Sequence, residues 1–178
     1  MIEFCYDSVG IAYFLNSGNM GPRSQIELAE RIFSEDNAFL HPIYRSNKKQ
    51  FIADVLYWGN YLLDQVTFDA EYPSIEKDFR HMGVQINRES FLLSEYSNVD
   101  LFFMNMRLQI RFTGTQDYVR KKLRTVLRAY GYQRRTAALV NHMRDCMMFY
   151  HIQPFLSGER KCDIRDIQLD DMITFRLI

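Results

Sequence analysis

The stretch YVRKKLRTVLRAYGYQRRTAALVNHMR, residues Tyr118–Arg144, carries eight Lys or Arg residues and no Asp or Glu. Its apolar residues recur at the spacing of amphipathic helices. We expect one helix from Asp117 to Tyr130, closed by Gly131, and a second from Arg134 to Tyr150. Two helices joined by a short Gly-containing turn are typical of a helix-turn-helix.

The two expected helices differ in what they would expose. In the first, Arg120, Arg124 and Arg128 are spaced i, i+4 and i+8, with Lys121 and Lys122 beside them. Like charges at this spacing destabilise an isolated helix by about 0.2–0.5 kcal/mol per pair. Acidic groups elsewhere in the protein, or an anionic ligand, should therefore balance this stripe.

In the second helix, one face is apolar and is expected to be buried. It holds Leu139, Val140, Met143, Cys146, Met147 and Tyr150. The opposite, outward face would hold Arg134, Ala138, Asn141, His142 and Asp145.

Three segments around these helices predict strands. From Met104 to Phe112 apolar and polar residues alternate strictly, which is typical of a half-buried strand. The segment IQPFL predicts a short edge strand, because Pro154 cannot complete a central ladder. After a polar loop over 157–171, the alternation in MITFRLI predicts a final strand.

The N-terminal part of the chain reads as helical. We expect helices over 24–33, with Ser24 and Glu27 at capping-box spacing, over 46–68, and over 74–83. The middle helix has a broad apolar face that includes Phe51, Val55 and Trp58. Its opposite face is a candidate protein-binding patch, or a surface that another helix covers: Asp54, Tyr57, Tyr61 and Asp64.

Taken in order, these elements predict an α+β protein with a helical region over 1–98 and a second region over 99–178. From residue 74 the expected order is helix, strand, helix, helix, strand and strand. This is the element order of a winged helix, a helix-turn-helix followed by a two-stranded wing. In such modules the first helix crosses the DNA backbone, and the N-terminal residues of the second meet the bases.

Charge supports this assignment, although the net charge of the chain is zero. Residues 115–161 hold ten Lys or Arg against three Asp or Glu, whereas residues 1–114 hold ten against fifteen. Local fields act over about 10 Å, so this partition matters more than the total. The candidate DNA contacts are Arg120, Lys121, Lys122, Arg124, Arg128, Arg134, Arg135, Asn141 and Arg144.

The loop over 157–171, here the wing loop, contains both basic and acidic residues. Arg160 and Lys161 can reach phosphate, whereas four acidic residues would be repelled by it: Asp163, Asp166, Asp170 and Asp171. Helix-turn-helix modules also serve as protein-interaction domains, so this loop leaves a protein partner open.

The run GYQRRTAALVNHMRDCM and the ending LDDMITFRLI resemble small winged-helix-type modules that accompany bacterial restriction and anti-phage defence proteins. The likeness lies in the order of elements and covers roughly the last third of the chain. It implies a bacterial or phage setting and a recognition role rather than a catalytic one.

The chain contains no phosphate-binding glycine loop, no nucleophile elbow and no metalloprotease motif. His142, Cys146, His151 and Cys162 are zinc-ligand residue types, but their spacing fits no standard zinc module. Five acidic residues could hold a divalent metal in a nuclease, but a solvent-exposed run of charges explains them better: Asp64, Asp69, Glu71, Glu76 and Asp78. We therefore expect no catalytic residue, metal or cofactor.

Three cysteines at wide spacing, and no apolar run of membrane-spanning length, favour a cytoplasmic protein with reduced thiols. The expected function is non-enzymatic recognition of duplex DNA, with regulation as one role, and with a nuclease partner or self-association through the N-terminal half. The alternative is a phage-encoded inhibitor of a host defence nuclease, of the anti-CRISPR or anti-restriction type. An enzyme with a dispersed site is a third reading.

Overall fold

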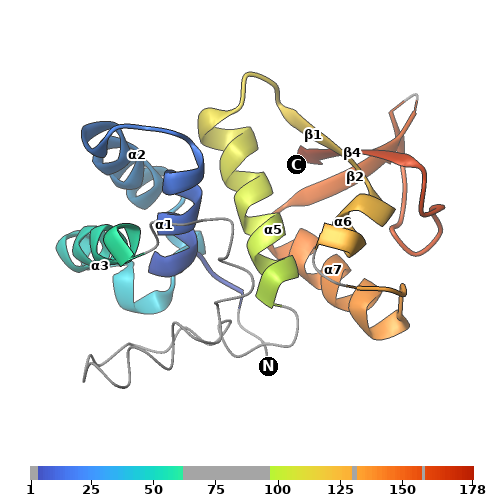
Figure 1. Ribbon diagram of the computed structural model, residues 1–178, viewed down its shortest axis with the longest axis horizontal. Coiled ribbons are helices and arrows are strands. Elements are labelled where there is room, and N and C mark those ends of the chain that lie inside the picture. Colours follow the sequence, from blue (N-terminus) through green and yellow to red (C-terminus); the bar gives the residue numbers. More distant parts are fainter. Residues whose placement is uncertain (1–3, 62–96, 130–131, 158) are drawn as a thin grey trace. The chain divides into compact units, whose positions relative to one another are not determined.

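The computed structural model describes residues 4–61, 97–129, 132–157 and 159–178 (Figure 1). The chain divides into two compact units, Met1–Ser97, here the N-terminal unit, and Asn98–Ile178, the C-terminal unit. Helices and one small antiparallel sheet make up the described residues, which confirms the expected α+β class.

The N-terminal unit contains the helices α1 (Ser8–Ser17), α2 (Pro22–Glu35) and α3 (Lys48–Tyr61), with short 3-10 helices η1 (Asn37–Phe39) and η2 (Pro42–Tyr44). α1 packs against both α2 and α3. Helix α2 confirms the expected helix over 24–33, but the capping box is wrong. The helix already begins at Pro22 after Gly21, because proline is favoured in the first helical turn.

Aromatic side chains fill the core of the N-terminal unit. The centre of the Phe51 ring of α3 lies 5.8 Å from the centre of the Phe33 ring and 5.5 Å from the centre of the Tyr44 ring. Phe51, Val55 and Trp58 are buried, as the apolar face of this helix predicts. The remaining part of the expected 46–68 helix, residues 62–68, and the whole expected helix over 74–83 lie outside the described residues.

The C-terminal unit begins with helix α5 (Ser97–Leu108), continued by a π-helical turn η4 (Gln109–Thr113). Strand β1 (Tyr118–Lys122) leads into helix α6 (Leu123–Ala129), and helix α7 (Ala137–Phe149) follows. The strands β2 (Ile152–Leu156), β3 (Arg160–Lys161) and β4 (Met172–Leu177) complete a four-stranded sheet of order β1-β4-β2-β3. All three pairings are antiparallel.

The strand expected over 104–112 is wrong, because these residues belong to α5 and η4. Most of α5 is buried, including Met104, Met106 and Leu108. Arg107, assigned by alternation to a polar face, is only 5% exposed, and its guanidinium donates a hydrogen bond to the Tyr150 carbonyl oxygen at 2.9 Å. A helix buried on most sides loses its 3.6-residue signal, so chance alternation dominated the pattern.

The helix expected over 117–130 is also wrong in its first half. Residues Tyr118–Lys122 form strand β1, paired with β4 from Tyr118↔Arg176 to Lys122↔Met172, and α6 begins only at Leu123. Tyrosine and valine favour strands when an edge of a sheet is available. Arg120 therefore does not share a helical face with Arg124 and Arg128.

Helix α7 confirms the second expected helix, with all six predicted core positions buried. It begins after Thr136, whose side-chain oxygen accepts the Leu139 N–H at 3.2 Å. The outward placement of His142 is wrong. This side chain is 7% exposed, because Asp100 of α5 packs against it and bonds its ring nitrogen.

The final strand is confirmed as β4, in which Ile173 and Phe175 are buried. β2 is not the expected edge strand, because it lies between β4 and the two-residue β3. The Pro154 carbonyl accepts the Cys162 N–H at 3.2 Å, on the β3 side. The N–H that proline lacks points to that same side, so the ladder to β4 loses nothing.

Candidate nucleic-acid interface

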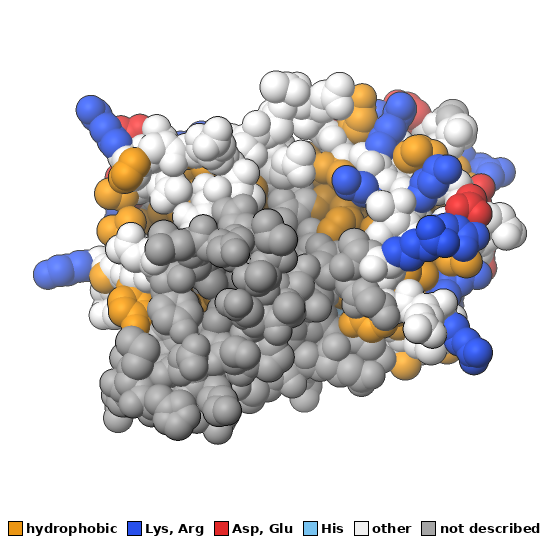
Figure 2. Space-filling view, in the orientation of Figure 1, with side chains coloured by type: hydrophobic (Ala, Val, Ile, Leu, Met, Phe, Trp, Pro, Cys, Tyr) orange, Lys and Arg blue, Asp and Glu red, His pale blue; other side chains and the backbone are white. Residues whose placement is uncertain are grey.

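The nine predicted DNA contacts all lie on the C-terminal unit. Figure 2 shows Lys and Arg side chains gathered over this part of the molecule. β1 carries Arg120, Lys121 and Lys122, and α6 carries Arg124 and Arg128. Arg134 and Arg135 precede α7, which itself carries Asn141 and Arg144. The strand, the two helices and the segment before α7 thus supply the whole set.

Arg124 is already held by a carboxylate of the same chain. Its Nε and Nη2 atoms donate to the two oxygens of Asp170 in the wing loop, both at 2.7 Å. The hydrogen bond and charge of Asp170 raise the pKa of Arg124, and in return lower the pKa of the Asp170 carboxyl. Lys122 and Arg128 add to this lowering through their charges.

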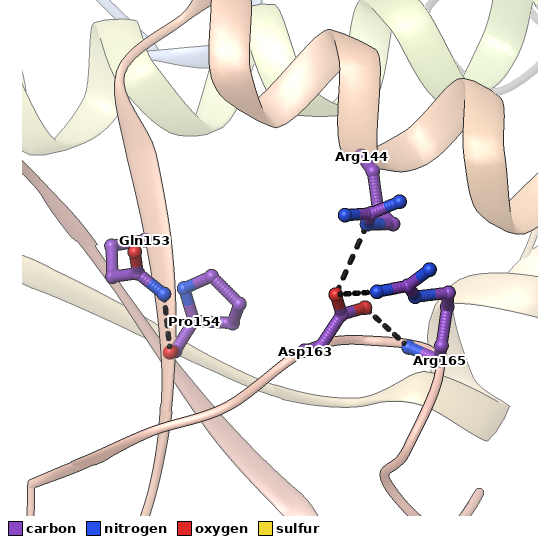
Figure 3. A network of polar contacts seen from close by, with 5 residues as sticks. All are labelled: Arg144, Gln153, Pro154, Asp163 and Arg165. Atoms are coloured by element: carbon purple, nitrogen blue, oxygen red, sulfur yellow. Dashed lines mark hydrogen bonds and ion pairs between the residues drawn. The ribbon is translucent and has the colours of Figure 1, made fainter.

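Arg144 is engaged in a second cluster, drawn in Figure 3. Asp163 Oδ2 lies 3.2 Å from Arg144 Nε and 2.8 Å from Arg165 Nη2, while the Arg165 N–H donates to Asp163 Oδ1 at 2.9 Å. Desolvation raises the pKa of Asp163, but the hydrogen bonds from Arg165 and the charge of Arg144 outweigh it, so the pKa lies below its ordinary value. This cluster fastens the wing loop to α7.

Two further arginines are oriented without being neutralised. Arg120 donates to Thr174 Oγ1 at 3.2 Å, and its guanidinium carbon lies 5.2 Å from the centre of the Tyr118 ring. Arg135 donates to the carbonyl oxygen of Ile167. A hydroxyl, an aromatic ring and a carbonyl fix the position of a guanidinium but leave its charge available.

The other predicted cations are exposed: Lys121, Lys122, Arg128 and Arg134. Over the described ranges, no carboxylate lies within ion-pair distance of any of them. Carboxylates of the same chain therefore neutralise only part of this basic surface, because they pair with Arg124 and Arg144. This pairing also engages two of the four acidic residues of the wing loop, Asp163 and Asp170.

The candidate protein-binding patch on α3 is only partly described. The Asp54 carboxylate accepts hydrogen bonds from the Tyr44 hydroxyl at 2.8 Å and the Gln50 amide at 2.6 Å, so its oxygens already serve the fold. Tyr57 is 39% exposed, with its ring edge-on to Trp58. The side chain of Tyr61 and all of Asp64 lie outside the described residues.

A buried polar contact that the sequence reading missed joins α5 to α7. His142 Nε2 contacts Asp100 Oδ1, and both side chains are almost inaccessible to solvent. Burial raises the pKa of Asp100, and the bond and charge of His142 oppose that rise. Burial also raises the pKa of the neighbouring Cys146 thiol. In the described part of the chain, no three His, Cys, Asp or Glu side chains are grouped as metal ligands.

Protein-family models, curated proteins and solved structures were each compared with this chain, and none matches it. Among the helices that the structure describes, none combines the length and the apolar character needed to cross a bilayer.

Proposed function

We propose that residues 98–178 form a winged helix that binds duplex DNA without catalysing a reaction. The order of α5, β1, α6, α7, β2 and β4, with the sheet order β1-β4-β2, supports this proposal. In this arrangement α6 and α7 are the helix-turn-helix, and β2, β4 and the loop between them are the wing. The observed order of elements arises from other residues than those expected, because the helix over 74–83 lies outside the described residues and residues 104–112 are helical.

The observation that carries the proposal is the exposed N-terminal end of α7. Arg134 and Arg135 come directly before the helix, and Ala137, Ala138 and Asn141 are exposed on its first turns. The second helix of a helix-turn-helix meets base edges with these positions. Small alanines permit close approach, arginine suits guanine and asparagine suits adenine.

Cations beside this helix suit the flanking phosphates. Lys121 and Lys122 end β1, and Arg128 lies on α6, the helix expected to cross the backbone. Arg120, held by Thr174 and Tyr118, presents a fixed charge on the same strand. Contacts of this kind position a protein on DNA without reading its sequence.

Replacing Lys122 and Arg128 with alanine should weaken binding to every duplex and reduce the slope of log affinity against log salt by about 2. Each variant would be titrated against a labelled random-sequence duplex at several salt concentrations. The variant Lys48→Ala with Lys49→Ala removes the same charge from α3 and should leave both quantities unchanged. Equal effects of the two pairs would mean that net charge, not this surface, governs binding.

Asn141→Ala should instead relax sequence preference at one base position, at a cost of about 1–3 kcal/mol for the preferred duplex. Sequencing of the duplexes that the wild type and the variant retain from a random pool measures this. An unchanged preferred sequence would contradict the placement of α7 at the bases.

Absence of any salt-sensitive binding by the wild type would favour the protein-contact alternative, an inhibitor whose nuclease complex survives loss of these cations.

Asp170→Asn should strengthen DNA binding by up to about fivefold, because it releases Arg124 from an exposed ion pair. The salt slope should rise as well, since one more cation reaches phosphate. Asp166→Asn is the matched control, because it removes the same charge from the same loop without freeing Arg124. If both variants gain equally, the wing acids act only by general repulsion.

A further inference from the structure

Strand β1 has one unpaired edge. It pairs with β4 along its whole length, and within the described residues no backbone group bonds its other side. Every second residue of Tyr118–Lys122 therefore directs its N–H and C=O away from the sheet. The edge contains no proline and no bulge, so its exposed cations are the feature that would discourage pairing with another basic strand.

A groove of about 300 Å³ adjoins this edge. Its walls come from α5, β1 and α6, and are apolar at Phe102, Met106, Val119 and Val126, with Lys121 among the polar lining residues. Figure 2 shows hydrophobic side chains at the surface of this unit, among the Lys and Arg side chains. Residues opposite one another on antiparallel strands project to the same face. A strand added to β1 would thus place alternate side chains over the groove, beside Val119 and Lys121.

One wall of the groove holds an unsatisfied polar atom. The Oδ1 atom of Asn105 is buried and accepts no hydrogen bond from any described residue. A buried acceptor without a donor costs about 1–3 kcal/mol. An occupant that supplies an N–H or O–H here would recover that free energy.

The positive charge of the β1 edge indicates which kind of strand could pair with it. Arg120, Lys121 and Lys122 are consecutive and exposed on this edge. A second copy added antiparallel would set three cations against three, and like charges directly opposite one another are destabilising. An acidic strand would meet them with favourable pairs.

We propose that the β1 edge and its groove bind an extended acidic segment of a partner protein by strand addition. Apolar side chains at every second position enter the groove beside Val119 and Lys121, and acidic side chains at the others meet Arg120 and Lys122 on the opposite face of the strand. Main-chain hydrogen bonds supply affinity and the groove supplies specificity, as in other modes of strand addition. This site shares Arg120, Lys121 and Lys122 with the proposed phosphate contacts, but it does not use the N-terminal end of α7, where the bases would be read.

The test uses a synthetic peptide of alternating Glu and Val residues, and two versions of it N-methylated at alternate amides. Bound peptide should slow hydrogen exchange at every second amide of Tyr118–Lys122. One N-methylated version should lose binding at least tenfold, because its methyl groups replace the donors that face β1. The other should bind like the parent, since its methylated amides face solvent. Equal binding of both versions, no binding of the parent at millimolar concentration, or uniform protection would overturn the proposal.

Two substitutions locate the site. Lys122→Glu, on the strand face that would meet the acidic side chains, should weaken peptide binding roughly tenfold, whereas Lys161→Glu, the same charge change on β3, should not. Thr125→Trp, at an exposed position on the groove wall, should block entry of the apolar side chains. Arg134→Ala should leave peptide binding unchanged, which separates this site from the DNA surface. Equal losses for Lys122→Glu and Lys161→Glu would show that the peptide responds to net charge alone.

Discussion

Replacing His142 with alanine should lower the free energy of unfolding of the C-terminal unit by about 3 kcal/mol, because it leaves a buried polar group without its main hydrogen-bond partner. The carboxyl group of Asp100 would remain in an almost inaccessible site, with the weakly donating Cys146 thiol as a side-chain partner. Urea denaturation followed by far-ultraviolet circular dichroism measures the change. Hydrogen exchange along α5 and α7 assigns it to this unit.

Two variants serve as controls for this prediction. Asn141→Ala changes the adjacent, exposed position of α7 and should alter the free energy of unfolding by less than about 0.5 kcal/mol. The double variant Asp100→Leu with His142→Leu should recover most of the loss, because replacing both partners of a buried polar pair leaves no charge unpaired. If the double variant is as unstable as His142→Ala, packing rather than the polar contact holds α5 to α7.

Phe51→Ala should cost the N-terminal unit about 3–5 kcal/mol, the range for truncating a buried phenylalanine. The Phe51 ring is fully buried and contacts Phe33 of α2 and Tyr44 of η2, so its loss opens a cavity where three elements meet. The chain has a single tryptophan, Trp58, which is buried in the same helix. Its fluorescence during urea denaturation reports the transition of this unit.

Lys49→Ala, an exposed change on α3, is the control for Phe51→Ala and should be nearly neutral. A loss below about 1 kcal/mol for Phe51→Ala would mean that neighbouring side chains close the cavity, since the cost depends on how far a site collapses.

The residue types in the sequence predicted which cations form the candidate interface, but not which of them pair with carboxylates. The nine predicted contacts were chosen from a basic stretch, and the structure places them all on one unit. Whether two of them, Arg124 and Arg144, are available to a ligand depends on Asp170 and Asp163, which lie in a loop remote in sequence and pair with them. Sequence spacing contains no signal for such pairs, because a loop can return to a helix at many registers.

The same reasoning explains the errors in the fold prediction. Alternation over 104–112 came from a helix whose polar residue Arg107 is buried through a bond to Tyr150. The helical spacing of Arg120, Arg124 and Arg128 spans a strand and a short helix, and β4 decides where one changes into the other. In both segments a distant part of the chain supplies the partner that local spacing cannot reveal.

The amino-acid sequence by itself determined α3, α7 and β4, including the buried positions of Phe51, Cys146 and Phe175. Each of these elements has one apolar face against the core and a polar face toward solvent, so its period is visible along the chain. Only the tertiary structure decided the helical state of α5, the strand β1 and the inward position of His142. These features depend on partners forty or more residues away, and burial on several sides or a free sheet edge outweighs local propensity there.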